Sequence, residues 1–291
     1  MPATQKTRSP YTISRATQAH VEHPERNEDF LLIDKVNGLV AIFDGVGSTA
    51  GEIASRLAAE RTHRGWRRFR KQHAPTGELQ CRDDEIEQGL MWIIDDAHQY
   101  VRLEGTRQAQ AIGSEHTPET TFALLIFCQQ EQGVSIVYAH AGDSRIYLLR
   151  PNEGLTRLTD DDGYLSILLE NQEITPEDAL RIDQTTHIEQ LTEQEISYFN
   201  KRNGITQALG DKKALDIHMS HHDIHAGDKL LLCTDGIHDN LTDEEIATVL
   251  AQSGRTRAAQ RLVQRATRRS QEDSLRAKND DMTAIVVSYE G

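Results

Sequence analysis

Residues 39–47 read Leu-Val-Ala-Ile-Phe-Asp-Gly-Val-Gly, an apolar run that ends on an aspartate and a glycine. A second run, Leu-Leu-Leu-Cys-Thr-Asp-Gly at 230–236, has the same organisation much later in the chain. Short apolar runs rich in Val, Ile and Leu are typical of buried strands. Each predicted strand therefore carries a carboxylate to its own end, Asp44 in one case and Asp235 in the other.

Three further acidic motifs stand beside predicted strands. Asp280-Asp281 precedes the run 283–288, Asp143 precedes 145–149, and Glu28-Asp29 precedes 30–33. Several carboxylates at neighbouring strand ends would repel one another, and a divalent cation relieves that repulsion. An all-oxygen ligand set favours Mg²⁺ or Mn²⁺ over Zn²⁺. A single Asp-Gly is also a common hairpin turn, so each motif taken alone leaves that alternative open.

Composition narrows the class of protein. The chain has 291 residues, 37% of them hydrophobic, and a formal charge of −14, so we expect one large domain over residues 1–291. An acidic surface repels nucleic acid and anionic lipid, and we expect neither as a partner. The amino terminus lacks an apolar signal core, and no apolar run approaches the ~18 residues of a membrane span. We therefore expect a cytoplasmic monomer.

Hydrophobic periodicity predicts a mixed α+β protein. Helical spacing of apolar residues covers 50–71, 84–103, 242–252 and 256–269. Strands are predicted at 30–33, 39–43, 121–128, 134–138, 145–149, 229–233 and 283–288. Short links at 129–133 and 139–144 predict that the strands at 121–128, 134–138 and 145–149 pair in antiparallel succession. Cys128 and Cys233 lie within apolar runs, which predicts buried thiols.

The segment 160–201 differs from its surroundings. It contains short helical pieces separated by polar connectors and has no strand pattern. We interpret it as a helical flap inserted over one edge of the sheets, where substrate-contacting segments commonly lie.

Six short motifs occur in a fixed order along the chain. They are Asn27-Glu28-Asp29-Phe30, Asp44-Gly45-Val46-Gly47, Gly142-Asp143-Ser144-Arg145, Ala208-Leu209-Gly210, Leu231-Leu232-Cys233-Thr234-Asp235-Gly236 and Asp280-Asp281-Met282-Thr283. In identity and order they resemble the motifs of the PP2C-type (PPM) metal-dependent serine/threonine protein phosphatases. The resemblance extends over almost the whole chain, about residues 12–288.

The resemblance implies a four-layer α-β-β-α sandwich, in which two antiparallel sheets are flanked by helices, with 160–201 as the variable flap. In the family's pattern Asp44 bridges two Mg²⁺ or Mn²⁺ ions, the Gly45 carbonyl binds one, and Asp235 and Asp280 hold the other. Glu28 and Asp29 would bind an ion or orient its water. Asp143 matches a ligand of a third, weaker ion in bacterial members. Asp44, Asp235 and Asp29 are accordingly the expected catalytic residues.

The implied activity is hydrolysis of phosphoserine and phosphothreonine in proteins by a water activated between the two ions. The expected partners are phosphorylated proteins and a cognate Ser/Thr kinase whose action the enzyme reverses. Several positions depart from the family pattern. The arginine that many members carry four residues before the motif glutamate is Pro24 here, which leaves Arg26 as the candidate phosphate ligand. Val46 replaces a histidine of eukaryotic members, and Asp281 replaces an asparagine.

Rival hypotheses make different use of the same residues. A pseudophosphatase would keep the sandwich and bind phosphoproteins or a kinase without hydrolysis. The histidines at 218, 221, 222 and 225 raise the alternative of a zinc site, but no cysteine accompanies them and we favour a solvated, pH-sensitive edge. The glycines at 45, 47 and 51 do not have the spacing of a dinucleotide-binding loop. An aspartyl-nucleophile phosphatase would need a second aspartate at position 46, which is Val46.

Overall fold

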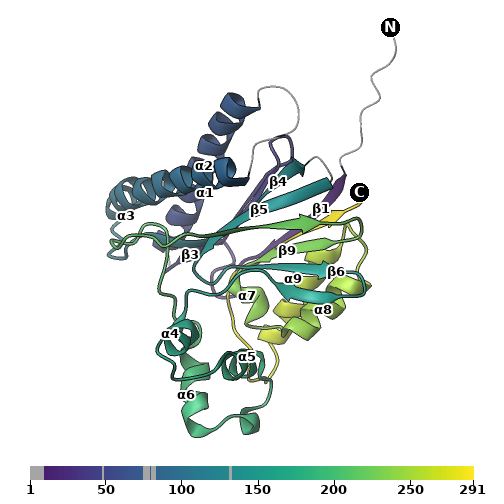
Figure 1. Ribbon diagram of the computed structural model, residues 1–291. Helices are drawn as coiled ribbons and strands as arrows, with labels where there is room; N and C mark the ends of the chain where they lie inside the picture. Colours follow the sequence, from purple (N-terminus) through teal and green to yellow (C-terminus); the bar gives the residue numbers. More distant parts are fainter. Residues whose placement is uncertain (1–9, 48, 75–78, 80–82, 131–132) are drawn as a thin grey trace.

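Two five-stranded antiparallel sheets lie face to face at the centre of the molecule (Figure 1). The computed structural model describes residues 10–47, 49–74, 79, 83–130 and 133–291. One sheet has the order β1 (Tyr11–Gln18), β10 (Met282–Tyr289), β9 (Lys229–Cys233), β6 (Arg145–Arg150), β7 (Gly154–Arg157). The other has the order β2 (Phe30–Asp34), β3 (Leu39–Val46), β4 (Glu119–Gln130), β5 (Gly133–Ala141), β8 (His218–Ile224).

The strands are apolar on both faces because each sheet is covered on both sides. In β3, Val40 and Ile42 face the opposite sheet, where they join residues of β6, β9 and β10 in one cluster. Leu39, Ala41 and Phe43 alternate with them and face the helices. This arrangement explains why the strands have continuous apolar runs and not the alternating pattern of a half-exposed sheet.

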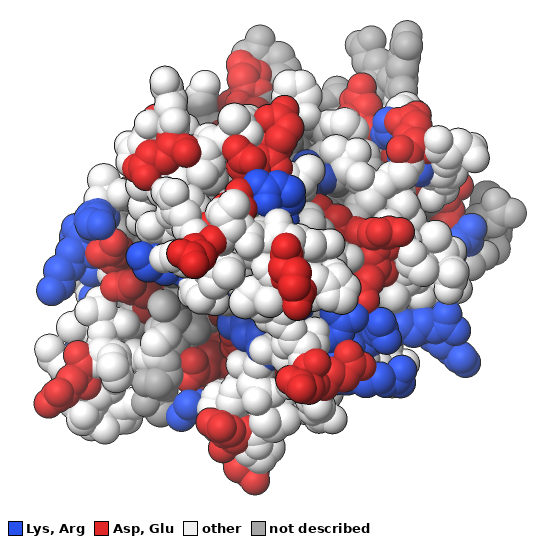
Figure 2. All heavy atoms as spheres, turned by 90° about the horizontal axis from the view of Figure 1, so that it is seen from below, with Lys and Arg blue, Asp and Glu red and all other residues white. Residues whose placement is uncertain are grey.

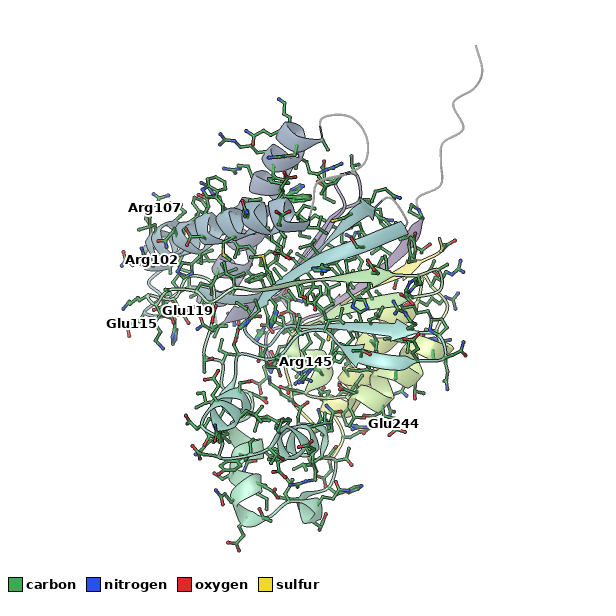
Figure 3. The ribbon with its side chains drawn as sticks, in the orientation of Figure 1. Arg102, Arg107, Glu115, Glu119, Arg145 and Glu244 are labelled. Atoms are coloured by element: carbon green, nitrogen blue, oxygen red, sulfur yellow. The ribbon has the colours of Figure 1, made fainter. Side chains whose placement is uncertain are left out.

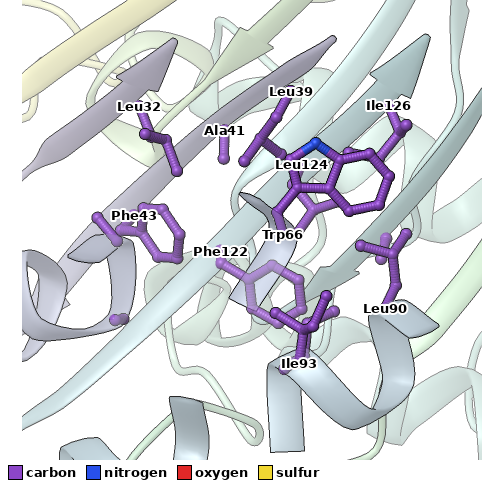
Figure 4. Packing of buried hydrophobic residues seen from close by; sticks show 14 of the residues in the cluster. Leu32, Leu39, Ala41, Phe43, Trp66, Leu90, Ile93, Phe122, Leu124 and Ile126 are labelled. Atoms are coloured by element: carbon purple, nitrogen blue, oxygen red, sulfur yellow. The ribbon is translucent and has the colours of Figure 1, made fainter. Parts of the chain in front are cut away.

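A pair of helices covers the outer face of each sheet. Helix α1 (Thr49–His73) and helix α2 (Asp83–Tyr100) cover the sheet of β3, and Figure 4 shows Trp66, Leu90 and Ile93 packed on that sheet's side chains. Helices α8 (Asp243–Gln252) and α9 (Ala258–Ser270) cover the other sheet through Ile246, Leu250 and Leu262. The predicted four-layer α-β-β-α sandwich is therefore confirmed.

The structure corrects two sequence-based predictions and adds three strands that the sequence did not predict. Strands β4 and β5 pair as expected, but β6 pairs with β9 and β7 in the other sheet, so the link at 139–144 crosses between sheets. The helix predicted over 84–103 does not end there. It continues through a π-helical turn, Val101–Gly105, into α3 (Thr106–Ala111). Strands β1, β7 and β8 were not predicted. They lie at sheet edges, where a strand is partly exposed, and their sequences are polar and contain no continuous apolar run.

The segment 160–201 forms the predicted helical insertion. It contains α4 (Tyr164–Glu170), α5 (Pro176–Gln184), a short 3₁₀ turn (Ile188–Gln190) and α6 (Glu193–Lys201), which lie at one end of the sandwich in Figure 1. Leu168, Ile182 and Phe199 give the flap a small core of its own. Within the described ranges, no helix combines the length and apolar character needed to cross a bilayer.

Cys128 and Cys233 are buried, as predicted. Cys81 and most of the connection that follows His73 fall outside the described residues, as does Ser48.

Candidate active site

The acidic motifs lie where strands of both sheets begin or end. Asp44 and Gly45 are near the end of β3, and Glu28 and Asp29 directly precede β2, which pairs with β3. Asp235 follows β9 and opens the short helix α7 (Asp235–His238). Asp280 stands two residues before β10, and Asp143 lies in the turn between β5 and β6. The sandwich therefore brings residues from distant parts of the sequence to one end.

Glycine is required where the strand end meets the first helix. A Cβ on Gly45 would lie 2.4 Å from the carbonyl carbon of Gly51 and 2.7 Å from the carbonyl oxygen of Glu28. The amide of Gly45 donates to that same Glu28 carbonyl at 3.1 Å. This close backbone approach holds the Glu28 segment against β3. Glycine follows Asp44 because there is no room for a side chain. A hairpin turn is not the reason, since β3 leads into helix α1 and not into a paired strand.

Electrostatic coupling shows that the carboxylates lie close together. Burial raises the pKa of Asp44 well above its usual value, and negative charge from Asp29, Asp235, Asp280 and Asp143 raises it further. Every group in that set is one of the acidic residues predicted from the sequence. The convergence of these five side chains is therefore a property of the fold.

Burial also raises the pKa of two carboxyls in the segment before β2. The pKa of Asp29 rises to about 8, although Thr283 and Thr234 oppose the shift by donating hydrogen bonds, the latter at 2.9 Å. The pKa of Glu28 rises to about 7, with the cation of Arg26 opposing the shift. Without a cation between them, these acids take up protons at neutral pH.

Lys278 is the cation that the described structure places among the acids. Its Nζ lies 2.8 Å from Asp239 and 3.0 Å from Asp280, and it also donates to Asp235. Burial opposes its charge, but these carboxylates hold the pKa of Lys278 well above its usual value. The pKa of Asp235 still rises to about 8 through burial. Sequence analysis missed Lys278 and Asp239, although Asp239 is one helical turn after Asp235.

The oxygen atoms at this site suit a hard divalent cation. Buried Asp29 Oδ1 and Glu28 Oε1 have no hydrogen-bond partner, although Arg26 Nε lies 3.1 Å from the latter. Unpartnered carboxylate oxygens in an all-oxygen group are the donors that Mg²⁺ and Mn²⁺ prefer. As placed around Lys278, however, no three Asp, Glu, His or Cys side chains of the described residues surround a common point. Lys278 thus occupies carboxylates that a metal ion would also use.

Asp281 has a positioning role. Its side chain accepts hydrogen bonds from the backbone amides of His20, at 2.7 Å, and Glu28, at 2.6 Å. A carboxylate accepts both, whereas an asparagine at this position could accept through only one of its side-chain atoms. The aspartate that replaces the family's asparagine thus holds the segment that carries Glu28 and Asp29 in place.

The histidine group from 218 to 225 does not gather around a point. His218 and His221 lie on opposite faces of edge strand β8, where His218 Nε2 is 2.9 Å from Asp162 and His221 is 4.0 Å from Glu87. Successive side chains of a strand alternate between faces, so neighbouring histidines cannot share one ion. The structure supports a solvated sheet edge and not a zinc site.

Comparison with known proteins identifies the family. A protein phosphatase 2C family model matches residues 17–278. The chain is 30% identical over 256 residues to the serine/threonine protein phosphatase PstP of Mycobacterium tuberculosis, covering 87% of this chain and 41% of that protein. It is 26% identical over 238 residues to the serine/threonine phosphatase stp of Listeria monocytogenes, covering 81% of each. The chain belongs to the protein phosphatase 2C family.

Solved structures agree on the fold. The M. tuberculosis PstP/Ppp phosphatase superposes with a TM-score of 0.72 and 24% identity, over 97% of this chain and 99% of that one. The catalytic domain of PstP in complex with two manganese ions gives a TM-score of 0.68, also at 24% identity. At this identity the likeness establishes the architecture only. The chain spans less than half the length of the mycobacterial protein it matches by sequence.

Proposed function

We propose that this chain is a metal-dependent phosphatase that hydrolyses phosphoserine and phosphothreonine in proteins, built as one domain over 1–291. The observation that carries the proposal is the convergence of Asp44 with Asp29, Asp235, Asp280 and Asp143, whose negative charges add to burial in raising the pKa of Asp44. Membership in the protein phosphatase 2C family supports the same reaction class.

We propose Mg²⁺ or Mn²⁺ as the cofactor, with Asp44 shared between two ions and the Gly45 carbonyl binding one of them. Asp235 and Asp280 would hold the other ion, with Glu28 and Asp29 beside the pair and Asp143 available to a third. When bound, such ions activate water at neutral pH and offset charge on the phosphoryl oxygens. Mn²⁺ occupancy in a related catalytic domain supports this assignment.

The chain's own residues prepare the site for a phosphate dianion. Thr234 donates to Asp29 Oδ2 at 2.9 Å and so directs the other oxygen of that carboxylate away from the threonine. Arg26 lies beside Glu28 and is 28% exposed, so its guanidinium can reach a substrate phosphate at the entrance. We keep Arg26 as the proposed phosphate ligand, and phosphorylated proteins and an opposing Ser/Thr kinase as the proposed partners.

The test is Mn²⁺-dependent hydrolysis of p-nitrophenyl phosphate and of a phosphothreonine peptide. We expect Asp44→Asn or Asp235→Asn to lower kcat/KM by about 100-fold or more, because each removes an anionic ligand proposed to hold an ion beside the reacting phosphate. Glu244→Gln is the matched control, since Glu244 is exposed on α8 and away from the acidic cluster (Figure 3). Circular dichroism and thermal unfolding would establish that each variant folds.

One observation favours a second candidate, a pseudophosphatase that binds phosphoproteins or a kinase. Lys278 pairs with Asp235 and Asp280, and an ammonium held by these carboxylates would compete with a metal ion for them. A wild-type protein with no turnover above the Asp44→Asn variant at millimolar Mn²⁺ would overturn the enzyme proposal in favour of this alternative.

A further inference from the structure

A cavity of about 430 Å³ lies between the flap and the sandwich. Asp143 and Asp239 line its inner end, and helices α4 and α5 form its outer wall. Because Asp143 also belongs to the acidic cluster around Asp44, the cavity borders the candidate active site. Its volume falls in the ~300–1,000 Å³ range of ligand-binding sites.

The charges that line the cavity are mostly negative. Three arginines lie against six acidic residues, one of which, Asp239, also pairs with Lys278 at 2.8 Å. The arginines are already engaged. Arg145 is buried and paired with Asp161 at 2.6 Å and Asp183 at 3.1 Å. Arg157 and Arg202 lie within 4.0 Å of acids of the same cavity.

The acids at the rim are less well neutralised. Glu170 is exposed and has no ion-pair partner in the described part of the chain, and the fully exposed Asp160 lies 3.7 Å from Arg157. Figure 2 views the molecule from the flap end, and acidic side chains are spread across the centre of that face. A phosphate or carboxylate entering here would meet like charge.

Three buried polar atoms of the lining lack partners: one donor, Nε of Arg202, and two acceptors. His238 is 2% exposed, and its Nε2 lies 3.0 Å from the carbonyl oxygen of Asp143, to which it donates. Its other nitrogen, Nδ1, has no hydrogen-bond partner and is then an acceptor in the neutral ring. Asn203 Oδ1 is a second buried acceptor without a donor. A ligand that satisfies both of these acceptors must supply hydrogen-bond donors, and a guanidinium or ammonium group supplies several.

The flap wall is apolar. Leu165 and Leu169 of α4 and Leu180 of α5 line the cavity, and Leu180 is 54% exposed. Lysine and arginine side chains bury their aliphatic stems on such surfaces and keep their charged ends among polar groups. An apolar wall facing the exposed carboxylates of Glu170 and Asp160 and two unpartnered acceptors thus suits a long cationic side chain.

We infer that this cavity binds a basic side chain, arginine or lysine, of the phosphorylated protein at a fixed position beside the phosphorylated residue. The inference rests on the proposed function, and it adds a substrate class: phosphopeptides with a basic residue near the phosphate. Glu170 and Asp160 attract the basic side chain at the rim, the leucines contact its stem, and His238 and Asn203 accept hydrogen bonds from its charged end inside the cavity.

The test uses phosphothreonine peptides in which a single arginine is moved through the flanking positions, each compared with a norleucine peptide. We expect arginine at one position or two adjacent positions to raise kcat/KM by about three- to tenfold, the gain typical of one or two partly exposed ion pairs. In the Asp160→Asn/Glu170→Gln variant the arginine-to-norleucine ratio should fall toward one. Glu189→Gln/Glu193→Gln removes two exposed flap charges outside the cavity and should keep the wild-type ratio.

Equal rates with arginine and norleucine at every position, or an arginine preference that survives the cavity variant, would overturn the inference. Loss of the preference as Mn²⁺ is raised would also overturn it, since the cavity would then hold an ion. If no peptide is hydrolysed, the proposed function fails instead. In that case the inference is tested separately, by fluorescence anisotropy of the unphosphorylated peptides. We expect the arginine peptide to bind more tightly to the wild type than to the cavity variant.

Discussion

At the scale of single residues, the candidate site is a balance between carboxylates and one ammonium group. Asp44 and Asp235 were predicted from the sequence because each follows an apolar run. Lys278 was not predicted, because it lies in a polar connecting segment, where the sequence does not distinguish a buried, ion-paired lysine from a solvent-exposed one. Its position among Asp235, Asp239 and Asp280 depends on how α7 and the start of β10 meet.

Removing this ammonium should change both stability and metal affinity. In Lys278→Met, three carboxylates lose their shared cation, so we expect the metal-free protein to lose about 1–3 kcal/mol of unfolding free energy, a reduced figure because Lys278 is 24% exposed. Calorimetric titration should show tighter Mn²⁺ binding, since the ion no longer competes with the ammonium. Lys213→Met is the control, because Lys213 is exposed and has no ion pair in the described structure. Unchanged Mn²⁺ affinity in Lys278→Met would contradict the competition.

At the scale of elements, the flap is attached to the sandwich by buried ionic contacts. Arg145 of β6 lies at the junction of sandwich and flap (Figure 3) and binds Asp161 and, on α5, Asp183. Arg276, which precedes β10, donates to the backbone carbonyls of Asp183, Thr185 and His238. Burial disfavours the charge of Asp183, but Arg145 outweighs it and keeps the pKa of that carboxyl below its usual range.

Substitution at this junction should loosen the flap. Asp183→Asn leaves Arg145 buried with one fewer carboxylate, and we expect about 3 kcal/mol of destabilisation in urea unfolding. Hydrogen–deuterium exchange should rise in α4, α5 and α6 more than in β3 or β4. Glu177→Gln, an exposed change on the same helix, should leave both measurements near wild type. A uniform rise in exchange across the sandwich would argue that Asp183 supports the whole fold and not the flap attachment.

At the scale of the whole molecule, the charge of −14 is unevenly distributed. Part of it is concentrated at one end of the sandwich, where burial raises the pKa values of Asp29 and Asp235 to about 8 from an ordinary 3.8. The folded, metal-free protein therefore binds more protons than the unfolded chain between about pH 4 and pH 8.

Stability in EDTA should consequently fall as pH rises through that window. We expect the unfolding free energy from urea titration to be higher at about pH 5 than at about pH 8, and Mn²⁺ to stabilise most at the alkaline end. The Asp29→Asn/Asp235→Asn variant should flatten the pH slope, because neither amide titrates. A slope as steep in that variant as in the wild type would assign the effect to other groups.

The sequence by itself determined the class of fold and most of the acidic cluster. Apolar runs and helical spacing depend on which faces are buried, and burial is encoded locally by residue type and period. The runs at 39–43 and 229–233 became β3 and β9, and the helical pieces of 160–201 became the flap. The acidic residues could also be predicted, because the apolar runs show where the strands end and the acidic residues stand at those ends.

Only the tertiary structure decided which sheet each strand joined and what surrounds the acids. Strand β6 pairs with β9 across a long separation in sequence, and no local signal distinguishes this pairing from a hairpin with β5. The ammonium of Lys278, the Asp281 anchor and the acceptors beneath the flap each depend on residues from separate segments. Such contacts follow from packing free energy over the whole chain, which residue-by-residue patterns do not contain.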